Sequence, residues 1–177
     1  MNETYLPKQL VALAERVIAE NRALGRKVAL AESCTGGLVA AALTEIPGSS
    51  AVLDRGYVTY SNDAKIECLG VPEDIIDTFG AVSVACAWAM AEGALRKSGA
   101  DIAVAVSGVA GPDGGTAFKP VGTVVFAKAL RNEASAPDGE MMLLDGGSRS
   151  EIRLQAAMEA LKLLLPVQPA AEAGGAP

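Results

Sequence analysis

Residues 28–37 read VALAESCTGG, so a short apolar run ends in an acid, a hydroxyl, a thiol and two glycines. This pattern predicts a buried strand that gives way to a helix, the junction where α/β proteins place binding and reactive groups. The helix N-terminus offers unpaired N–H groups and the positive end of a dipole, which can hold an anion or a developing oxyanion. Ser33 is therefore a candidate nucleophile.

The chain contains no histidine. A Ser-His-Asp triad and any histidine-ligated metal site are therefore excluded, and a different base must take the proton of Ser33. No metal and no cofactor are expected.

Each feature of this junction has an alternative explanation. Ser33 would also serve as the N-cap of the following helix, a position that favours serine. Gly36 and Gly37 favour a ligand, because glycine in a helix costs about 1 kcal/mol relative to alanine and is kept where something approaches the backbone closely. Cys34 is the rival nucleophile, since a helix N-terminus lowers a thiol pKa, although the role of a small buried hydrophobic residue is favoured.

The composition narrows the class of protein. A length of 177 residues predicts one domain, residues 1–165, followed by a Pro/Ala/Gly-rich tail, residues 166–177, that is expected to be disordered. The three cysteines have no CxxC spacing and the N-terminus shows no leader pattern, which favours a reduced, cytoplasmic setting. The net charge of −6, without a basic run, argues against nucleic acid, and no apolar stretch is long enough to span a membrane.

Hydrophobic spacing, caps and breaker residues define the expected elements. The expected helices are Pro7–Leu24, Thr35–Glu45, Asn62–Leu69 capped by Asn62, Val71–Phe79, Ser83–Lys97 capped by Ser83, and Ser148–Leu165. The expected strands are Lys27–Ala31, Ala51–Tyr60, Ile102–Ser107, Val121–Leu130 and Met141–Asp145, the last two forming a hairpin around a turn at 136–139. This order predicts an α/β fold, a three-layer α/β/α sandwich with a mixed, mainly parallel sheet.

A lysine follows the second strand closely. Lys65 falls near the start of a short helix, where the dipole opposes a cation, and the same dipole together with burial would lower its pKa towards that of a general base. A solvated lysine on a helical face is the alternative. Tyr60 could orient the proton, although a tyrosine at a strand end more often packs at the rim of a core.

The stretch Ser107–Thr116 is a glycine-rich loop after a buried strand. It lacks the order of a P-loop, but successive N–H groups in such a loop can form an anion-binding nest. Arg149 and Arg153 share one face of the first turn of the last helix, where a bound phosphate would offset the unfavourable dipole. Arg153 could instead pair with Glu151 or another surface acid.

Small residues on the helix after Ser83 permit close packing between subunits. We expect a homodimer on this basis, although small residues also serve ordinary core contacts. The residues in question are Ala85, Ala87, Ala89 and Ala91.

Taken together, several motifs resemble the CinA C-terminal domain family over residues 5–165, in the order of that family. They are residues 31–37, Tyr60-Ser61-Asn62 with Lys65, residues 80–83, and residues 107–116 with 119–123. The resemblance implies a nicotinamide-nucleotide amidase, which converts nicotinamide mononucleotide to nicotinate mononucleotide and ammonia without a metal or cofactor. Activities of the molybdopterin-binding-like domain found in larger relatives are not carried over.

The resemblance also implies residue roles. Ser33 would be the nucleophile, Lys65 its base and Tyr60 a supporting hydroxyl, with Lys119 as the other lysine to consider as base. The expected substrate-binding residues are Thr35, Gly36, Ser107, Gly108, Gly111, Gly115, Thr116 and Arg149. A non-catalytic, nucleotide-binding regulatory module linked to competence or DNA damage, and an amidase for another substrate, are the alternatives.

Overall fold

The computed structural model describes residues 4–132 and 138–166 as one α/β domain built on a single sheet. The sheet has the strand order β2-β1-β3-β4-β5. Its strands are β1 (Val28–Glu32), β2 (Leu53–Val58), β3 (Ile102–Gly108), β4 (Thr123–Leu130) and β5 (Asp138–Leu143). The helices are α1 (Lys8–Ala23), α2 (Leu38–Thr44), α3 (Asn62–Leu69), α4 (Glu73–Phe79), α5 (Val84–Arg96) and α6 (Arg149–Leu163), and a 3₁₀ turn spans Ser49–Ala51.

The predicted three-layer sandwich with a mixed sheet is confirmed. Strands β2, β1 and β3 pair in parallel, while β4 pairs antiparallel with both β3 and β5. The central strands β1 and β3 are apolar and buried along their length, as expected for parallel strands covered on both faces.

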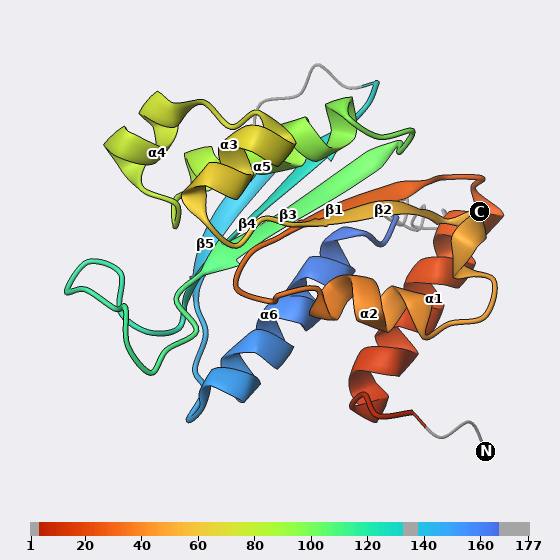
Figure 1. The fold of residues 1–177 in the computed structure, drawn as a ribbon. Coiled ribbons are helices and arrows are strands. Elements are labelled where there is room, and N and C mark those ends of the chain that lie inside the picture. Colours follow the sequence, from red (N-terminus) through yellow and green to blue (C-terminus); the bar gives the residue numbers. More distant parts are fainter. Residues whose placement is uncertain (1–3, 133–137, 167–177) are drawn as a thin grey trace, which may run out of the picture.

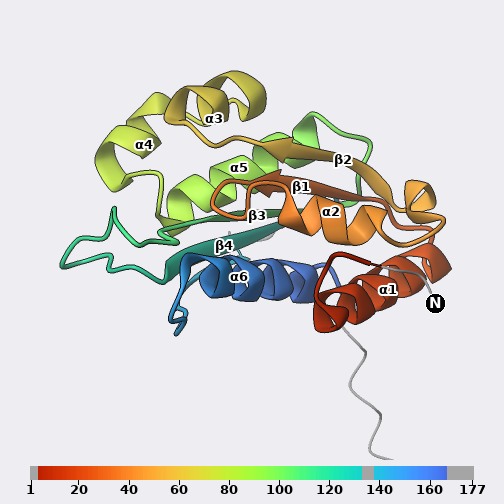
Figure 2. The same cartoon turned by 60° about the horizontal axis from the view of Figure 1, so that its bottom comes forward.

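Two groups of helices cover the sheet (Figures 1 and 2). Helices α1, α2 and α6 pack against one another on one face, over a core that includes Leu30, Val104 and Phe126. Helices α3, α4 and α5 lie on the other face, where α5 contacts β1, β3 and β4. Gly93 of α5 permits a close approach to α3, because a Cβ there would overlap the carbonyl group of Leu69.

Most predicted elements are present, with shifted ends. Helix α2 begins at Leu38 and not at Thr35, α3 is capped by the Ser61 hydroxyl and not by Asn62, and Ser83 caps α5 as predicted. The predicted hairpin is confirmed, but β5 begins at Asp138, inside the segment expected to be its turn. Residues 133–137 of that turn and the predicted tail from residue 167 onwards lie outside the described residues.

Three of the four alanines expected to form a dimer interface are buried within the domain itself, and Ala85 is partly exposed. Ala87, Ala89 and Ala91 of α5 belong to the core beneath α3 and α4, so that argument for a dimer was wrong, while the dimer itself remains a prediction. Over the described residues, no helix has the length and apolarity needed to cross a membrane.

Candidate active site

The candidate site lies where three neighbouring parallel strands end. Ser33 directly follows β1, Thr59 to Ser61 follow β2, and Ser107 lies near the end of β3. Two backbone hydrogen bonds hold these ends together, from Ser33 N to Val106 O at 2.9 Å and from Thr59 N to Glu32 O at 2.8 Å. The carboxyl ends of parallel strands are where open α/β sheets place their ligands.

A buried carboxylate occupies the N-terminus of α2. Glu32 is 1% exposed, and its carboxylate accepts hydrogen bonds from the Thr35 hydroxyl at 2.7 Å and from the N–H groups of Gly37, Val39 and Ala40 at 2.9–3.1 Å. The acid therefore satisfies helix donors that sequence reasoning had left free for a substrate anion. Ser33 is released from the role of N-cap, which falls to Gly37.

The glycine pair is explained by backbone conformation. Gly36 and Gly37 have φ values of +61° and +92°, a region in which residues with a Cβ are strained. The two glycines turn the chain between Ser33 and α2, so the inference that a ligand requires them is replaced by this turn. Thr35 is fully buried with its hydroxyl on Glu32 and does not line the cavity described below.

The structure brings Lys65 to Ser33. Lys65 Nζ lies 3.1 Å from Ser33 Oγ, 2.8 Å from Thr59 O and 3.4 Å from Ser61 O. Helix α3 places the lysine there, because Ser61 caps it at the end of β2 and Lys65 lies in its first turn, facing the sheet.

Lys65 is only 1% exposed, and no carboxylate in the described ranges lies within ion-pair distance of it. Burial lowers the pKa of Lys65 because the charged ammonium loses its hydration and gains no opposite charge. The alternative of a solvated surface lysine is therefore wrong.

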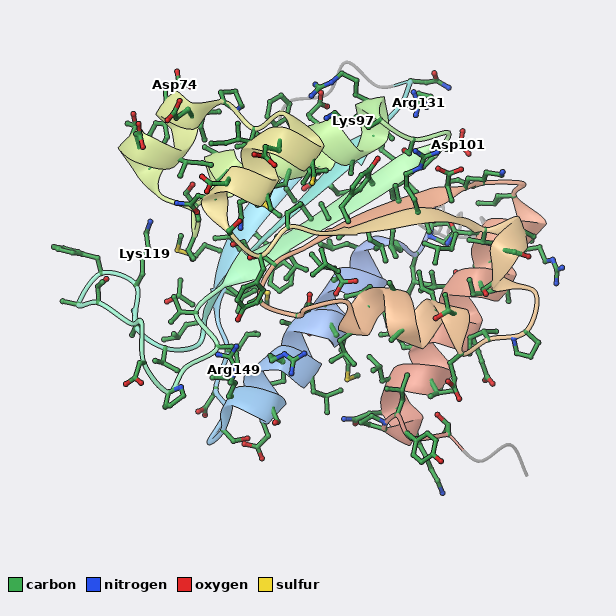
Figure 3. The ribbon with its side chains drawn as sticks, viewed as in Figure 1. Asp74, Lys97, Asp101, Lys119, Arg131 and Arg149 are labelled. Carbon is green, nitrogen blue, oxygen red and sulfur yellow. The ribbon has the colours of Figure 1, made fainter. Side chains whose placement is uncertain are left out.

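Ser33 and Lys65 line a cavity of about 210 Å³. Its other lining residues are Cys34, Tyr60, Asn62, Ala81, Val82, Ser107, Gly108, Ala110 and Arg149. Arg149 crosses the rim, donating to Gly111 O at 2.6 Å and to the Tyr60 hydroxyl at 2.8 Å. Tyr60 is 61% exposed, so it forms part of the rim and not of the core. Figure 3 shows Arg149 at the start of α6, below the strand ends.

For two further side chains in the cavity, Ser107 and Cys34, the surroundings fix the hydrogen bond or the protonation. Ser107 donates its hydroxyl proton to Ala81 O at 2.9 Å, which leaves its oxygen lone pairs available. Burial raises the pKa of Cys34 to about 11, so this thiol is protonated at neutral pH and lacks the thiolate that a nucleophilic cysteine needs.

The tip of the glycine-rich loop lies apart from this cavity. Gly115 and Thr116 are exposed and do not line it, and Thr116 accepts a hydrogen bond from Lys119 N within the loop. The Lys119 ammonium donates to Phe79 O at 2.8 Å, at the end of α4 (Figure 3). Gly108 lines the cavity and Gly111 anchors Arg149 through its carbonyl, so only the base of the loop reaches the site.

Sequence reasoning missed Glu32 and misjudged Arg153. An acid that ends a buried strand just before two glycines was the signal for Glu32. The guanidinium of Arg153 donates to Cys34 O at 3.2 Å and Thr35 O at 2.7 Å, so the alternative of a pairing with Glu151 was wrong. In the described parts of the chain, no cluster of three or more Cys, Asp or Glu side chains could hold a metal ion.

The fold and site define a three-layer α/β domain with a buried serine–lysine pair at its strand ends. The family model of the CinA C-terminal domain matches residues 10–167, and the chain belongs to that family.

Known relatives agree with this assignment. The chain is 50% identical to the nicotinamide-nucleotide amidohydrolase PncC of Enterobacter agglomerans, over 89% of this chain and 94% of that protein. It is 52% identical to a CinA-like protein of Mycolicibacterium vanbaalenii, over 86% of this chain, and spans about a third of the length of that and several other curated relatives. The crystal structure of the competence/damage inducible protein CihA from Agrobacterium tumefaciens superposes with a TM-score of 0.87 at 51% identity, covering 92% of this chain and 97% of that one.

Replacing Glu32 tests its role as the clamp of the turn. Glu32→Ala leaves three N–H groups and the Thr35 hydroxyl without their acceptor, and we expect the free energy of unfolding to fall by about 3 kcal/mol or more. Urea unfolding measures the change. Glu20→Ala is the control, because Glu20 makes only a surface ion pair with Arg16, and its expected cost is below about 0.5 kcal/mol. Equal costs for the two variants would contradict this role.

Proposed function

We propose that this protein is an amidohydrolase that converts nicotinamide mononucleotide to nicotinate mononucleotide and ammonia, with Ser33 as nucleophile and Lys65 as base. The observation that carries the proposal is the 3.1 Å contact between Ser33 Oγ and Lys65 Nζ inside a cavity. The name of the Enterobacter agglomerans relative supports the substrate.

The contacts of Lys65 can accommodate an uncharged amine. A neutral amine has two N–H bonds and one lone pair. The two carbonyl oxygens of Thr59 and Ser61 accept the two N–H bonds, and the lone pair is left for the Ser33 hydroxyl. Lys65 is thus arranged to accept the Ser33 proton, and its lowered pKa provides the basic form at a pH where an exposed lysine is charged.

The reaction proceeds in two halves. Ser33 Oγ attacks the carboxamide carbon and its proton passes to Lys65 Nζ. The tetrahedral intermediate then collapses, the C–N bond breaks, and Lys65 returns the proton to the leaving nitrogen, which departs as ammonia. Water attacks the resulting ester with Lys65 again as base, releasing the carboxylate product and restoring Ser33.

Two backbone N–H groups near Ser33 have no protein acceptor among the described residues, and of these two residues only Cys34 lines the cavity. Within residues 33–40, the N–H groups of Cys34 and Thr35 donate to no acceptor outside their own residue. The others bond to Val106, Ser33, Thr35 and Glu32 or lie within helix α2. Cys34 lines the cavity beside Ser33, and its N–H is the donor that follows the nucleophile.

The cavity suits the reacting end of the substrate. Its volume of about 210 Å³ is below the ~300–1,000 Å³ of pockets that take a whole drug-sized ligand. The carboxamide and ring would enter it, with the Ser107 oxygen accepting from the carboxamide nitrogen. The ribose and phosphate would lie across the rim against Gly108 and Arg149, whose guanidinium suits a phosphate.

Removing the nucleophile separates catalysis from binding. We expect Ser33→Ala to reduce ammonia release from nicotinamide mononucleotide to background, because no other hydroxyl lies beside Lys65 Nζ in the described structure, while calorimetry still detects the bound nucleotide. Binding by the wild type without turnover would favour the regulatory module instead. Turnover of analogues with another ring, or without the phosphate, would reveal a different amide substrate.

The pH–rate profile identifies the base. Because burial lowers the Lys65 pKa, we expect kcat to rise with pH at a midpoint below that of an exposed lysine. We expect Lys65→Met to be inactive at every pH and Lys119→Met, whose ammonium binds Phe79 O away from the cavity, to keep the wild-type profile. Loss of activity in Lys119→Met alone would make Lys119 the base.

The pH dependence of protein stability gives a second measure of the lowered Lys65 pKa. With its pKa lowered in the folded state, the unfolded chain binds more protons between the two pKa values, so the free energy of unfolding should rise with pH there. Lys65→Met should flatten this rise.

A further inference from the structure

We propose that Arg153 is a positioning residue that fixes the turn after Ser33, and with it the orientation of the Cys34 N–H that binds the oxyanion. This inference rests on the proposed serine mechanism and adds a residue that does not line the cavity. It gives a role to a partly buried arginine contact that neither the sequence patterns nor the substrate explains.

Three peptide groups link Ser33 to Gly36, and hydrogen bonds fix the orientation of each. In a planar trans peptide the C=O and the following N–H point in opposite directions, so fixing one group aims the other. Ser33 O accepts from Gly36 N at 3.0 Å, which directs the Cys34 N–H away from that bond. Cys34 O accepts from Arg153 Nε at 3.2 Å, and Arg153 also holds Thr35 O, the carbonyl of the peptide group whose Gly36 N–H makes the bond to Ser33 O.

The same guanidinium also holds the next peptide group. Arg153 donates to Thr35 O at 2.7 Å, and Leu38 N donates to the same oxygen at 3.3 Å. The turn is thus held from two sides, by Glu32 through N–H groups and by Arg153 through carbonyl oxygens. A cation on Thr35 O also polarises that peptide group, which strengthens the Gly36 N–H bond to Ser33 O and so holds the Ser33–Cys34 peptide group more firmly.

Arg153 contacts the backbone of the turn and does not line the cavity, so it can hold the turn but does not touch a substrate there. It reaches the turn from α6, behind the cavity, whereas Arg149 of the same helix crosses the rim. Its two carbonyl contacts use the fork of donors that only an arginine provides. Loss of these contacts should therefore reduce the stabilisation of the transition state more than the binding of the substrate.

The test compares two arginines that make the same kind of contact. Arg131 also donates to backbone carbonyls, those of Leu95, Ser98 and Ala100, at the opposite end of the sheet from Arg149 (Figure 3). Arg153→Met and Arg131→Met each retain an apolar stem and lose the guanidinium. Steady-state ammonia release from nicotinamide mononucleotide, its pH profile and urea unfolding are measured for both.

We expect Arg153→Met to lower kcat by about tenfold or more, less than the ~10²–10³-fold loss of deleting a donor outright. KM should change less than kcat, and the pH midpoint should stay at its wild-type position because Arg153 does not touch Lys65. Arg153→Lys should recover part of kcat, and Arg131→Met should keep wild-type kcat whatever its stability. Wild-type kcat in Arg153→Met, or equal losses of kcat in both variants, would overturn the inference.

A second assay covers the case in which nicotinamide mononucleotide is not the substrate. If the wild type releases no ammonia, the same variants are compared by their rate of acylation with p-nitrophenyl acetate, with Ser33→Ala as the blank. Slower acylation in Arg153→Met than in Arg131→Met supports the inference. Equal rates in the two variants, or a wild type that is acylated no faster than Ser33→Ala, overturn it.

Discussion

The site depends on keeping the amino group of Lys65 out of water without giving it a carboxylate. Desolvation alone lowers the pKa of this lysine, whereas an ion pair would raise it and remove the base. Two carbonyl oxygens, of Thr59 and Ser61, satisfy the amine without stabilising its charge as strongly as an acid would. In a chain with no histidine, we propose that this arrangement activates Ser33.

The parallel half of the sheet makes that arrangement possible. Because β2 and β1 run side by side in the same direction, the segment that holds Lys65 and the segment that holds Ser33 leave the sheet at one edge. Glu32 then fixes the turn after β1 through donors of α2. The positive end of that helix is thereby used inside the protein, and in the mechanism we propose the substrate's negative charge is bound by the Cys34 N–H and by Arg149.

Much of this could be predicted from the sequence, and the failures have physical causes. Apolar runs and helix caps predicted the elements and the layers, and the absence of histidine directed attention to Lys65. The start of α2 was missed because positive φ at Gly36 and Gly37 is a property of the folded turn, and a ligand was inferred in its place. Long-range contacts were not predictable from local patterns, since Arg153 meets Cys34 O from a helix more than a hundred residues away. The tip of the glycine-rich loop was predicted to bind substrate but does not line the cavity. Composition does not show which part of a loop faces a cavity.

The central claim, that Lys65 is a buried amine poised to be neutral, can be measured without any substrate. Titration of ¹⁵N-labelled lysine side chains by NMR, with Lys65→Met to assign the signal, gives the pKa of this one amine beside those of the exposed lysines. The account predicts that Lys65 titrates at lower pH than the other lysines. A Lys65 signal that titrates together with the exposed lysines would contradict it.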